Sequence, residues 1–134
     1  MKTIVKLTAG LALVVVLGLS PGTVHGLSLA EKANLQAAMQ RHIDRNAVDG
    51  MFLYFDQASN SVRGLHPVTT HPKILTVDDY YVVCFDFRDD AGKHVNVDFF
   101  MAPRDDTYVV FHTSVDGDKL VGQLVREGRA SLVQ

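Results

Sequence analysis

The core of this protein can be derived from one stretch in the middle of the chain, YYVVCFDFRDDAGKHVNVDFFMA, which runs from Tyr80 to Ala102. Its two halves, Tyr80–Arg88 and Lys93–Ala102, alternate between apolar and polar residues, with the period of two that is typical of strands buried on one face. Asp89–Gly92 between them is typical of a turn, in which Gly92 can adopt a positive φ. This stretch therefore predicts an antiparallel hairpin.

A three-residue loop at Asp90–Gly92 sets the register of this hairpin. It gathers the apolar residues on one face and the polar residues on the other, whereas a slip of one residue would mix the two sets and bury charge. The pairs expected on the apolar face are Phe87 with Val95, Phe85 with Val97 and Val83 with Phe99. The pairs expected on the polar face are Arg88 with His94, Asp86 with Asn96 and Cys84 with Asp98.

The same reasoning extends the sheet to a strand at Thr107–Val115, after a turn at Pro103–Asp106. The pairs expected across this second hairpin are Phe99 with Phe111, Met101 with Val109 and Asp98 with His112. The carboxylate of Asp98 would then lie within hydrogen-bond reach of the His112 imidazole. The residues expected to be buried are Phe85, Phe87, Val97, Phe99 and Phe111, and those expected to be more exposed are Asp86, His94 and Asn96.

The segments outside the two hairpins predict one clear helix, from about Leu29 to Val48. Ser28 and Glu31 match a capping box at its start, and an apolar stripe recurs every four residues at Leu35, Met39 and Ile43. Met51–Asp56 has the composition of a strand.

Two segments leave alternatives open. Val62–Val77 is extended, but Pro67 and Pro72 each remove a ladder donor, which indicates an edge strand with a bulge or two short strands. Lys119–Glu127 can form a short helix or a strand, and its shared apolar face favours the helix.

These elements predict an α+β fold, with an N-terminal helix packed on a four- or five-stranded antiparallel sheet. A helix followed by such a meander resembles the cystatin-like and NTF2-like folds, by analogy of layout alone. The chain has no cystatin-type inhibitory Gln-x-Val-x-Gly loop, and a fold of this kind does not by itself define a function.

The N-terminus has the three parts of a secretory signal peptide. Lys2 and Lys6 precede an apolar run, Leu7–Leu19, which is long enough for a signal core and too short to span a bilayer as a helix. The small residues at Val24–Gly26 predict cleavage after position 26, and the alternative is an uncleaved anchor. We expect a secreted or periplasmic protein without stable membrane insertion after cleavage. The domains expected are a signal peptide over 1–26 and a single α+β domain over 27–134.

Charge and cysteine content restrict the possible functions of this domain. The chain has 13 basic and 15 acidic residues, and removal of the two signal-peptide lysines leaves a mature net charge of about −4. Without a basic cluster, the domain is a poor candidate for nucleic-acid binding. Cys84 is the only cysteine, so no intramolecular disulfide can form, and its apolar neighbours predict a buried thiol.

The polar face of the sheet is the candidate functional surface. A carboxylate beside an imidazole, as expected for Asp98 and His112, raises histidine basicity for acid–base chemistry. The simpler interpretation is a solvated face, which any antiparallel sheet covered on one side presents. A nucleophilic Cys84 is disfavoured because it would lie two strands from His112. The binding candidates are Cys84, Asp86, Arg88, His94 and Asn96.

No metal or cofactor site is predicted. The odd spacing of His66 and His71 places them on opposite faces of a regular strand. The paired aspartates lie at strand ends, where they suit turns, and no Asp-x-Asp-x-Asp-Gly loop is present.

The chain lacks every strong catalytic signature, so we expect a small exported domain that binds an unknown protein or small-molecule ligand, with Val62–Val77 as the candidate edge for strand addition. The alternative is a small NTF2-like enzyme or ligand-binding pocket. In that case Asp98 would orient His112 as a base, beneath a covering segment at Leu120–Val133.

Overall fold

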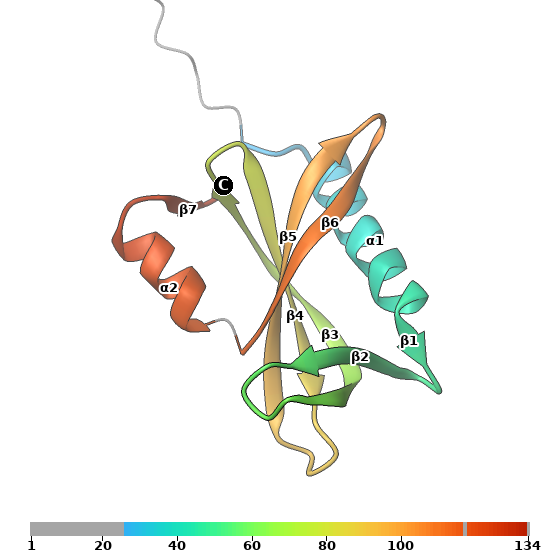
Figure 1. Ribbon diagram of the computed structural model, residues 1–134. Helices are drawn as coiled ribbons and strands as arrows, with labels where there is room; N and C mark the ends of the chain where they lie inside the picture. Colours follow the sequence, from blue (N-terminus) through green and yellow to red (C-terminus); the bar gives the residue numbers. More distant parts are fainter. Residues whose placement is uncertain (1–25, 117, 134) are drawn as a thin grey trace, which may run out of the picture.

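The computed structural model describes residues 26–116 and 118–133, where a seven-stranded antiparallel sheet carries two helices (Figure 1). The helices are α1 (Leu29–Arg45) and α2 (Asp118–Arg126). The strands are β1 (Ala47–Val48), β2 (Met51–Asp56), β3 (Ser61–Val77), β4 (Tyr80–Arg88), β5 (His94–Arg104), β6 (Thr107–Val115) and β7 (Ala130–Leu132). Strands β1 to β6 lie side by side in chain order, and β7 pairs with the end of β3.

The prediction of one helix on a four- or five-stranded sheet is wrong, and with it the cystatin-like and NTF2-like layouts. The sheet has seven strands, and a second helix lies on the opposite side from α1 (Figure 1). The additional strands are β1, which pairs with the start of β2, and the C-terminal β7. Strands of two and three residues are too short to show an alternating pattern, so tertiary pairing alone defines them.

Helix α1 begins at the predicted capping box. The Ser28 hydroxyl accepts a hydrogen bond from the Glu31 N–H at 3.2 Å, and the Glu31 carboxylate accepts one from the Ser28 N–H at 2.8 Å. The expected stripe is buried against the sheet at Leu35, Met39 and Ile43. These contacts place α1 on the apolar face of the hairpins.

One core cluster fills the space between α1 and the sheet. Phe85, Phe87, Val97 and Phe99 are all buried in it, as predicted. The rings of Phe52 and Phe99 meet edge to face at 5.8 Å between centroids, which joins β2 to the same core.

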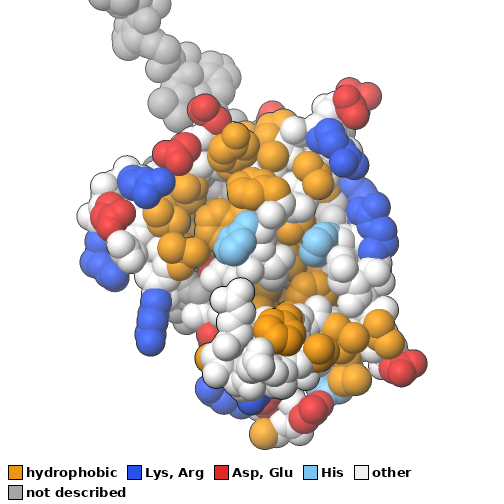
Figure 2. Space-filling model, in the orientation of Figure 1, with side chains coloured by type: hydrophobic (Ala, Val, Ile, Leu, Met, Phe, Trp, Pro, Cys, Tyr) orange, Lys and Arg blue, Asp and Glu red, His pale blue; other side chains and the backbone are white. Residues whose placement is uncertain are grey.

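A second, smaller cluster lies on the opposite face, beneath α2 and β7. Its buried members are Val77, Val82, Cys84, Phe100, Leu124 and Ala130. The helix favoured at 119–127 is therefore confirmed, and the thiol of Cys84 is buried as expected. Figure 2 shows apolar and histidine side chains gathered beside α2 on this face. The face expected to be polar and solvated is thus partly covered.

The register of the β4–β5 hairpin is confirmed pair by pair. All six pairs expected on its two faces occur. Gly92 has a φ of +76°, and its N–H donates to the Asp89 carbonyl at 2.9 Å, as the three-residue loop requires.

The register of the β5–β6 hairpin differs from the prediction at two points. Arg104 pairs with Thr107, so the loop consists of Asp105 and Asp106 alone, and Asp105 adopts a φ of +51° that aspartate tolerates. Phe111 then forms a bulge, because Phe100 pairs with His112 while Met101 pairs with Val110.

The shorter loop and the bulge at Phe111 change which β6 residue lies opposite each β5 residue. Ser114, and not His112, lies opposite Asp98. Phe111 is 54 % exposed rather than buried, and its ring packs on Tyr80 at 5.2 Å. The predicted Asp98–His112 pair is therefore wrong, because the shorter loop and the bulge each shift the pairing by one residue, which makes two in all.

Strand β3 is one irregular 17-residue strand. Its register shifts between Pro67 and Thr69 and again between Thr70 and Ile74, so the predicted bulge is confirmed. Its pairing is divided along its length: β2 pairs with residues 61–65, β4 with residues between 66 and 77, and β7 with residues 75–77. Among the described strands, β4 alone pairs with residues 66–74, so the segment proposed for strand addition keeps an open edge there, as predicted.

Candidate functional site

The structure gathers several of the predicted residues around Asp86. One carboxylate oxygen of Asp86 lies 3.0 Å from His71 Nε2, and the other lies 2.7 Å from His94 Nε2. The three side chains come from β3, β4 and β5 and are called here the histidine–aspartate bridge. His71 reaches Asp86 from the irregular segment of β3 that follows Thr70.

The other polar residues of this face lie under α2. Asp98 is 1 % exposed, and Asn96, at 8 %, is buried rather than exposed as expected. The Asn96 side-chain amide donates to Asp98 Oδ1 at 2.9 Å. Arg88 turns away from this group, and its guanidinium donates to the Gly92 carbonyl at 2.8 Å.

A cavity of about 370 Å³ opens between these side chains and α2. We call it the α2 cleft. It is lined by His71, Cys84, His94, Asn96, Asp98, Val121 and Gly122. The cleft lies where a pocket under the C-terminal segment was expected, but its imidazoles are those of His71 and His94.

His112, the candidate base of the alternative enzyme hypothesis, takes no part in this group. Its exposed imidazole contacts the Phe100 ring at 5.4 Å between centroids. His66 lies 3.0 Å from an oxygen of Asp90 and so contacts a different carboxylate from His71. In residues 26–116 and 118–133, no three His, Cys, Asp or Glu side chains are arranged to hold a metal ion.

A larger concavity, of about 680 Å³, lies between β2, the end of β6 and the C-terminal end of α1. We call it the edge groove. Its lining consists of two continuous runs, 52–57 and 112–116, together with His42, Asn46 and Arg63. This groove is not among the features predicted from the sequence.

The two continuous runs show which part of each strand faces the edge groove. Successive side chains of a strand point to opposite faces, so a face contributes only every second residue to a cavity. Six consecutive residues from β2 and its following loop, and five from the end of β6 and the residue after it, therefore indicate that strand edges face the groove. These edges carry backbone N–H and C=O groups.

Pairing within the sheet agrees with this interpretation. β3 occupies one edge of β2, and β1 covers only the first two residues of the other. The N–H of Leu53 donates to the Asn46 carbonyl at 3.4 Å, and beyond this point no described strand pairs with the outer edge of β2. β6 is likewise the last strand in the order, with β5 on one side only among the described residues.

Three titratable side chains that line the edge groove have shifted pKa values. Burial lowers the pKa of His42, and the charge of Arg45 lowers it further, so this imidazole is neutral at pH 7. Burial also raises the pKa of Tyr54, with a further contribution from the Asp56 carboxylate. The hydroxyl of Ser59 donates to Asp56 at 2.6 Å and lowers the pKa of that carboxyl group, which also pairs with Arg63 at 3.3 Å.

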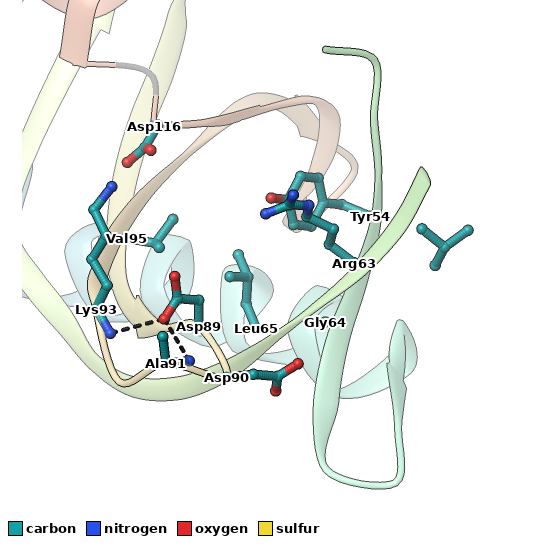
Figure 3. Close-up of a pocket in the computed structure, with 11 residues that line it drawn as sticks. Tyr54, Arg63, Gly64, Leu65, Asp89, Asp90, Ala91, Lys93, Val95 and Asp116 are labelled. Atoms are coloured by element: carbon teal, nitrogen blue, oxygen red, sulfur yellow. Dashed lines mark hydrogen bonds between the residues drawn. The ribbon is translucent and has the colours of Figure 1, made fainter. Parts of the chain in front are cut away.

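A basin of about 410 Å³ adjoins the edge groove and shares Tyr54, Arg63 and Asp116 with it. Figure 3 shows Leu65 and Val95 between a wall formed by Tyr54 and Arg63 and the opposite side near Asp116. The groove therefore continues towards the β4–β5 turn as a hollow with an apolar floor and charged sides.

One signal in the sequence could have indicated the edge groove. The run Phe52–Phe55 is apolar at every position, whereas a strand with one solvated face alternates with polar residues. The rest of the site depends on which strand edges remain unpaired, and this is a property of the folded sheet rather than of any local motif.

No protein-family model, curated protein or solved structure matches this chain. In the described part of the chain, neither helix has the length and apolar character needed to cross a membrane. The functional class must therefore be argued from the edge groove and the α2 cleft.

Proposed function

We propose that the protein is a small exported domain that binds an extended segment of a partner polypeptide in the edge groove, without catalysing a reaction. The observation that supports this proposal is that the unpaired edges of β2 and β6 flank one cavity. An unpaired edge presents a row of backbone donors and acceptors, which an incoming strand can satisfy.

The dimensions and lining of the edge groove suggest the kind of segment that fits. Residues 53–57 extend over roughly 16 Å at the usual rise of a strand, which matches a segment of about five residues. Phe52 and Tyr54 supply aromatic surface, so apolar side chains would pack against them. The carboxylate of Asp116 favours a basic side chain nearby, whereas that of Asp56 already pairs with Arg63 at 3.3 Å.

Alternate N-methylation of a bound peptide tests strand addition directly. Peptides would be selected from a random display library against the mature protein, and the best binder resynthesised with N-methyl groups at its odd or its even residues. A paired strand directs alternate N–H groups towards its partner. We therefore expect one series to lose binding at least tenfold and the other to retain it.

Amide hydrogen exchange then locates the bound peptide. Binding in the edge groove is expected to slow exchange in 53–56 or 113–115 and to leave the β3–β4 pairs unchanged. Equal tolerance of both N-methyl series, or protection confined to other elements, would contradict the proposal.

Export is the second part of the proposal and rests on the signal-like sequence of residues 1–26. Residues 1–25 lie outside the described residues. We expect the intact mass of the protein from the secreted or periplasmic fraction to correspond to a chain that starts at Leu27. A full-length cytoplasmic form as the sole product would argue against export.

A further inference from the structure

We infer that the segment bound in the edge groove runs antiparallel to β2 and carries apolar side chains at alternate positions, which cover an exposed apolar face of β2 and β3. This inference rests on the proposed strand addition and specifies its partner, an extended polypeptide with one apolar face. We call the covered surface the hairpin face. It consists of Met51, Leu53 and Phe55 of β2 with Val62 and Gly64 of β3.

The hairpin face is apolar at every position and exposed at its outer end. Phe55 and Val62 are cross-strand partners on this face, and they are 58 % and 67 % exposed. Nearer β1, Met51 lies over Gly64, since a Cβ atom at Gly64 would come within 3.0 Å of the Met51 sulfur. A contiguous apolar surface, unlike scattered apolar residues, indicates an interaction site.

Neither helix provides the missing cover. Successive side chains of a strand alternate, so the hairpin face lies opposite the face from which Phe52 enters the α1 core. Among the described residues, neither core cluster includes a member of the hairpin face. Figure 1 shows α2 at the left of the molecule, apart from the β2–β3 hairpin. The apolar surface therefore lacks an intramolecular partner in the described part of the chain.

The hairpin face is continuous with the proposed peptide site. Leu53 and Phe55 belong to this face and also line the edge groove. A strand added to the outer edge of β2 would extend the sheet on both of its faces. Its side chains on one face would then lie beside Leu53 and Phe55, while the others point towards the interior of the groove.

Two open strand edges differ in how they are protected against pairing. Segment 66–74 of β3, which pairs with β4 alone among the described strands, contains Pro67, Pro72 and Lys73. Prolines and lysines on an edge prevent uncontrolled strand pairing. Residues 51–55 of β2 contain neither a proline nor a charged residue. The outer edge of β2 is therefore the one suited to an incoming strand.

Backbone alternation determines which residues of the segment cover the hairpin face. The Leu53 N–H donates to the Asn46 carbonyl on the outer side of β2, so the N–H and C=O of Phe55, two residues further on, face the same side. In an antiparallel pair, the residue opposite Phe55 exchanges both hydrogen bonds with it and has its side chain on the same face. The residues that pair with β2 are thus the ones that cover the hairpin face.

The antiparallel direction suits both walls of the edge groove. Four antiparallel pairings separate β2 from β6, so these two strands run in the same direction along the sheet. A segment that is antiparallel to β2 is therefore also antiparallel to β6. The expected partner has apolar residues at i and i+2, with residue i opposite Phe55 and residue i+2 reaching Leu53.

A double-mutant cycle between Phe55 and the bound peptide tests this inference. The peptide selected for N-methylation would be resynthesised with serine at each position in turn, and its affinity measured for the natural protein and for Phe55→Ser. At the positions where N-methylation prevents binding, we expect serine to weaken binding about tenfold in the natural protein and no more than about threefold in Phe55→Ser. Serine at the intervening positions should have equal effects in both proteins.

Two further variants control for the loss of an aromatic ring. Phe55→Leu should keep the coupling, because it retains an apolar side chain. Phe111→Ser removes a ring that is 54 % exposed outside the hairpin face, so it should also leave the coupling unchanged. Loss of the coupling in Phe111→Ser to the same extent as in Phe55→Ser would overturn the inference.

The remaining outcomes separate this inference from the proposed function. Equal serine effects in the natural protein and Phe55→Ser would overturn the inference alone, because the N-methyl series tests strand addition independently. Tolerance of both N-methyl series would contradict strand addition and the inference with it. Sedimentation of the mature protein without peptide detects a second copy on the same surface. A dimer that Phe55→Ser dissociates would overturn the inference.

Discussion

At the scale of single residues, His42 links the stability of the fold to pH. Its half-buried ring lies 5.7 Å from that of Phe99 and 6.2 Å from that of Phe52. Burial lowers its pKa from the usual 6.5, so the unfolded chain binds a proton at this residue more readily than the folded chain. This contribution to stability is therefore complete above about pH 6.5 and is lost as the pH falls through the folded pKa.

Replacement of His42 by Phe should reduce the acid sensitivity of the protein. An apolar ring keeps the contacts with Phe52 and Phe99 but carries no proton to bind. We expect the thermal midpoint of His42→Phe to fall less between pH 7.5 and pH 5 than that of the natural protein. His112→Phe, at an exposed imidazole, is the matched control and should retain the natural pH dependence. An identical pH dependence in His42→Phe would contradict this account.

Single residues also explain why the sequence predicts one hairpin and not the next. Gly92 identifies the loop of β4–β5 locally, and every pair of that hairpin follows from it. The bulge at Phe111 has no such signal, because phenylalanine there suits a regular strand equally well. Together with the shorter Asp105–Asp106 loop, the bulge shifts the pairing by two residues, so Ser114 and not His112 lies opposite Asp98.

At the scale of elements, the histidine–aspartate bridge ties the irregular part of β3 to β4 and β5. His71 follows Thr70, where the β3–β4 register shifts, and its hydrogen bond to Asp86 crosses that irregular segment. The prolines predicted this bulge correctly. They could not indicate the direction in which His71 would point, because that depends on the neighbouring strands.

Asp86→Asn should weaken the hydrogen bonds that join His71 of β3 and His94 of β5 to β4. The amide retains one acceptor oxygen, so it can accept a hydrogen bond from only one of the two imidazoles, and the other contact requires the other tautomer of its ring. We expect a loss of about 1 kcal/mol in the free energy of unfolding by urea, with faster amide exchange in 70–74. Asp90→Asn is the matched control, because its contact with His66 is exposed and should contribute little. Equal effects of the two substitutions would show that the bridge does not hold β3.

At the scale of the whole molecule, one sheet separates two cores of unequal size. Alternate residues of the same strands face opposite sides, so Val83 and Phe99 belong to the α1 cluster, while Val82 and Phe100 belong to the α2 cluster. The sequence predicted the first cluster from its apolar pattern. The second was missed because its strand residues share their face with polar residues such as Asp86 and Asp98, and because β7 is too short to recognise.

The two cores should differ in their role in stability. Phe99 is fully buried in the larger cluster, so Phe99→Ala is expected to lower the free energy of global unfolding by about 3–5 kcal/mol. Leu124 is the α2 residue buried in the smaller cluster, and Leu124→Ala should mainly release α2 and β7 as a local unit.

Hydrogen exchange distinguishes these two outcomes. For Leu124→Ala, we expect faster exchange in 118–133 with little change in the β4–β5 pairs, because the α1 core remains intact. The peptide binding proposed for the edge groove should be kept in this variant. If exchange instead rose equally in all strands, the two cores would form one cooperative unit, and α2 could not move independently of the sheet.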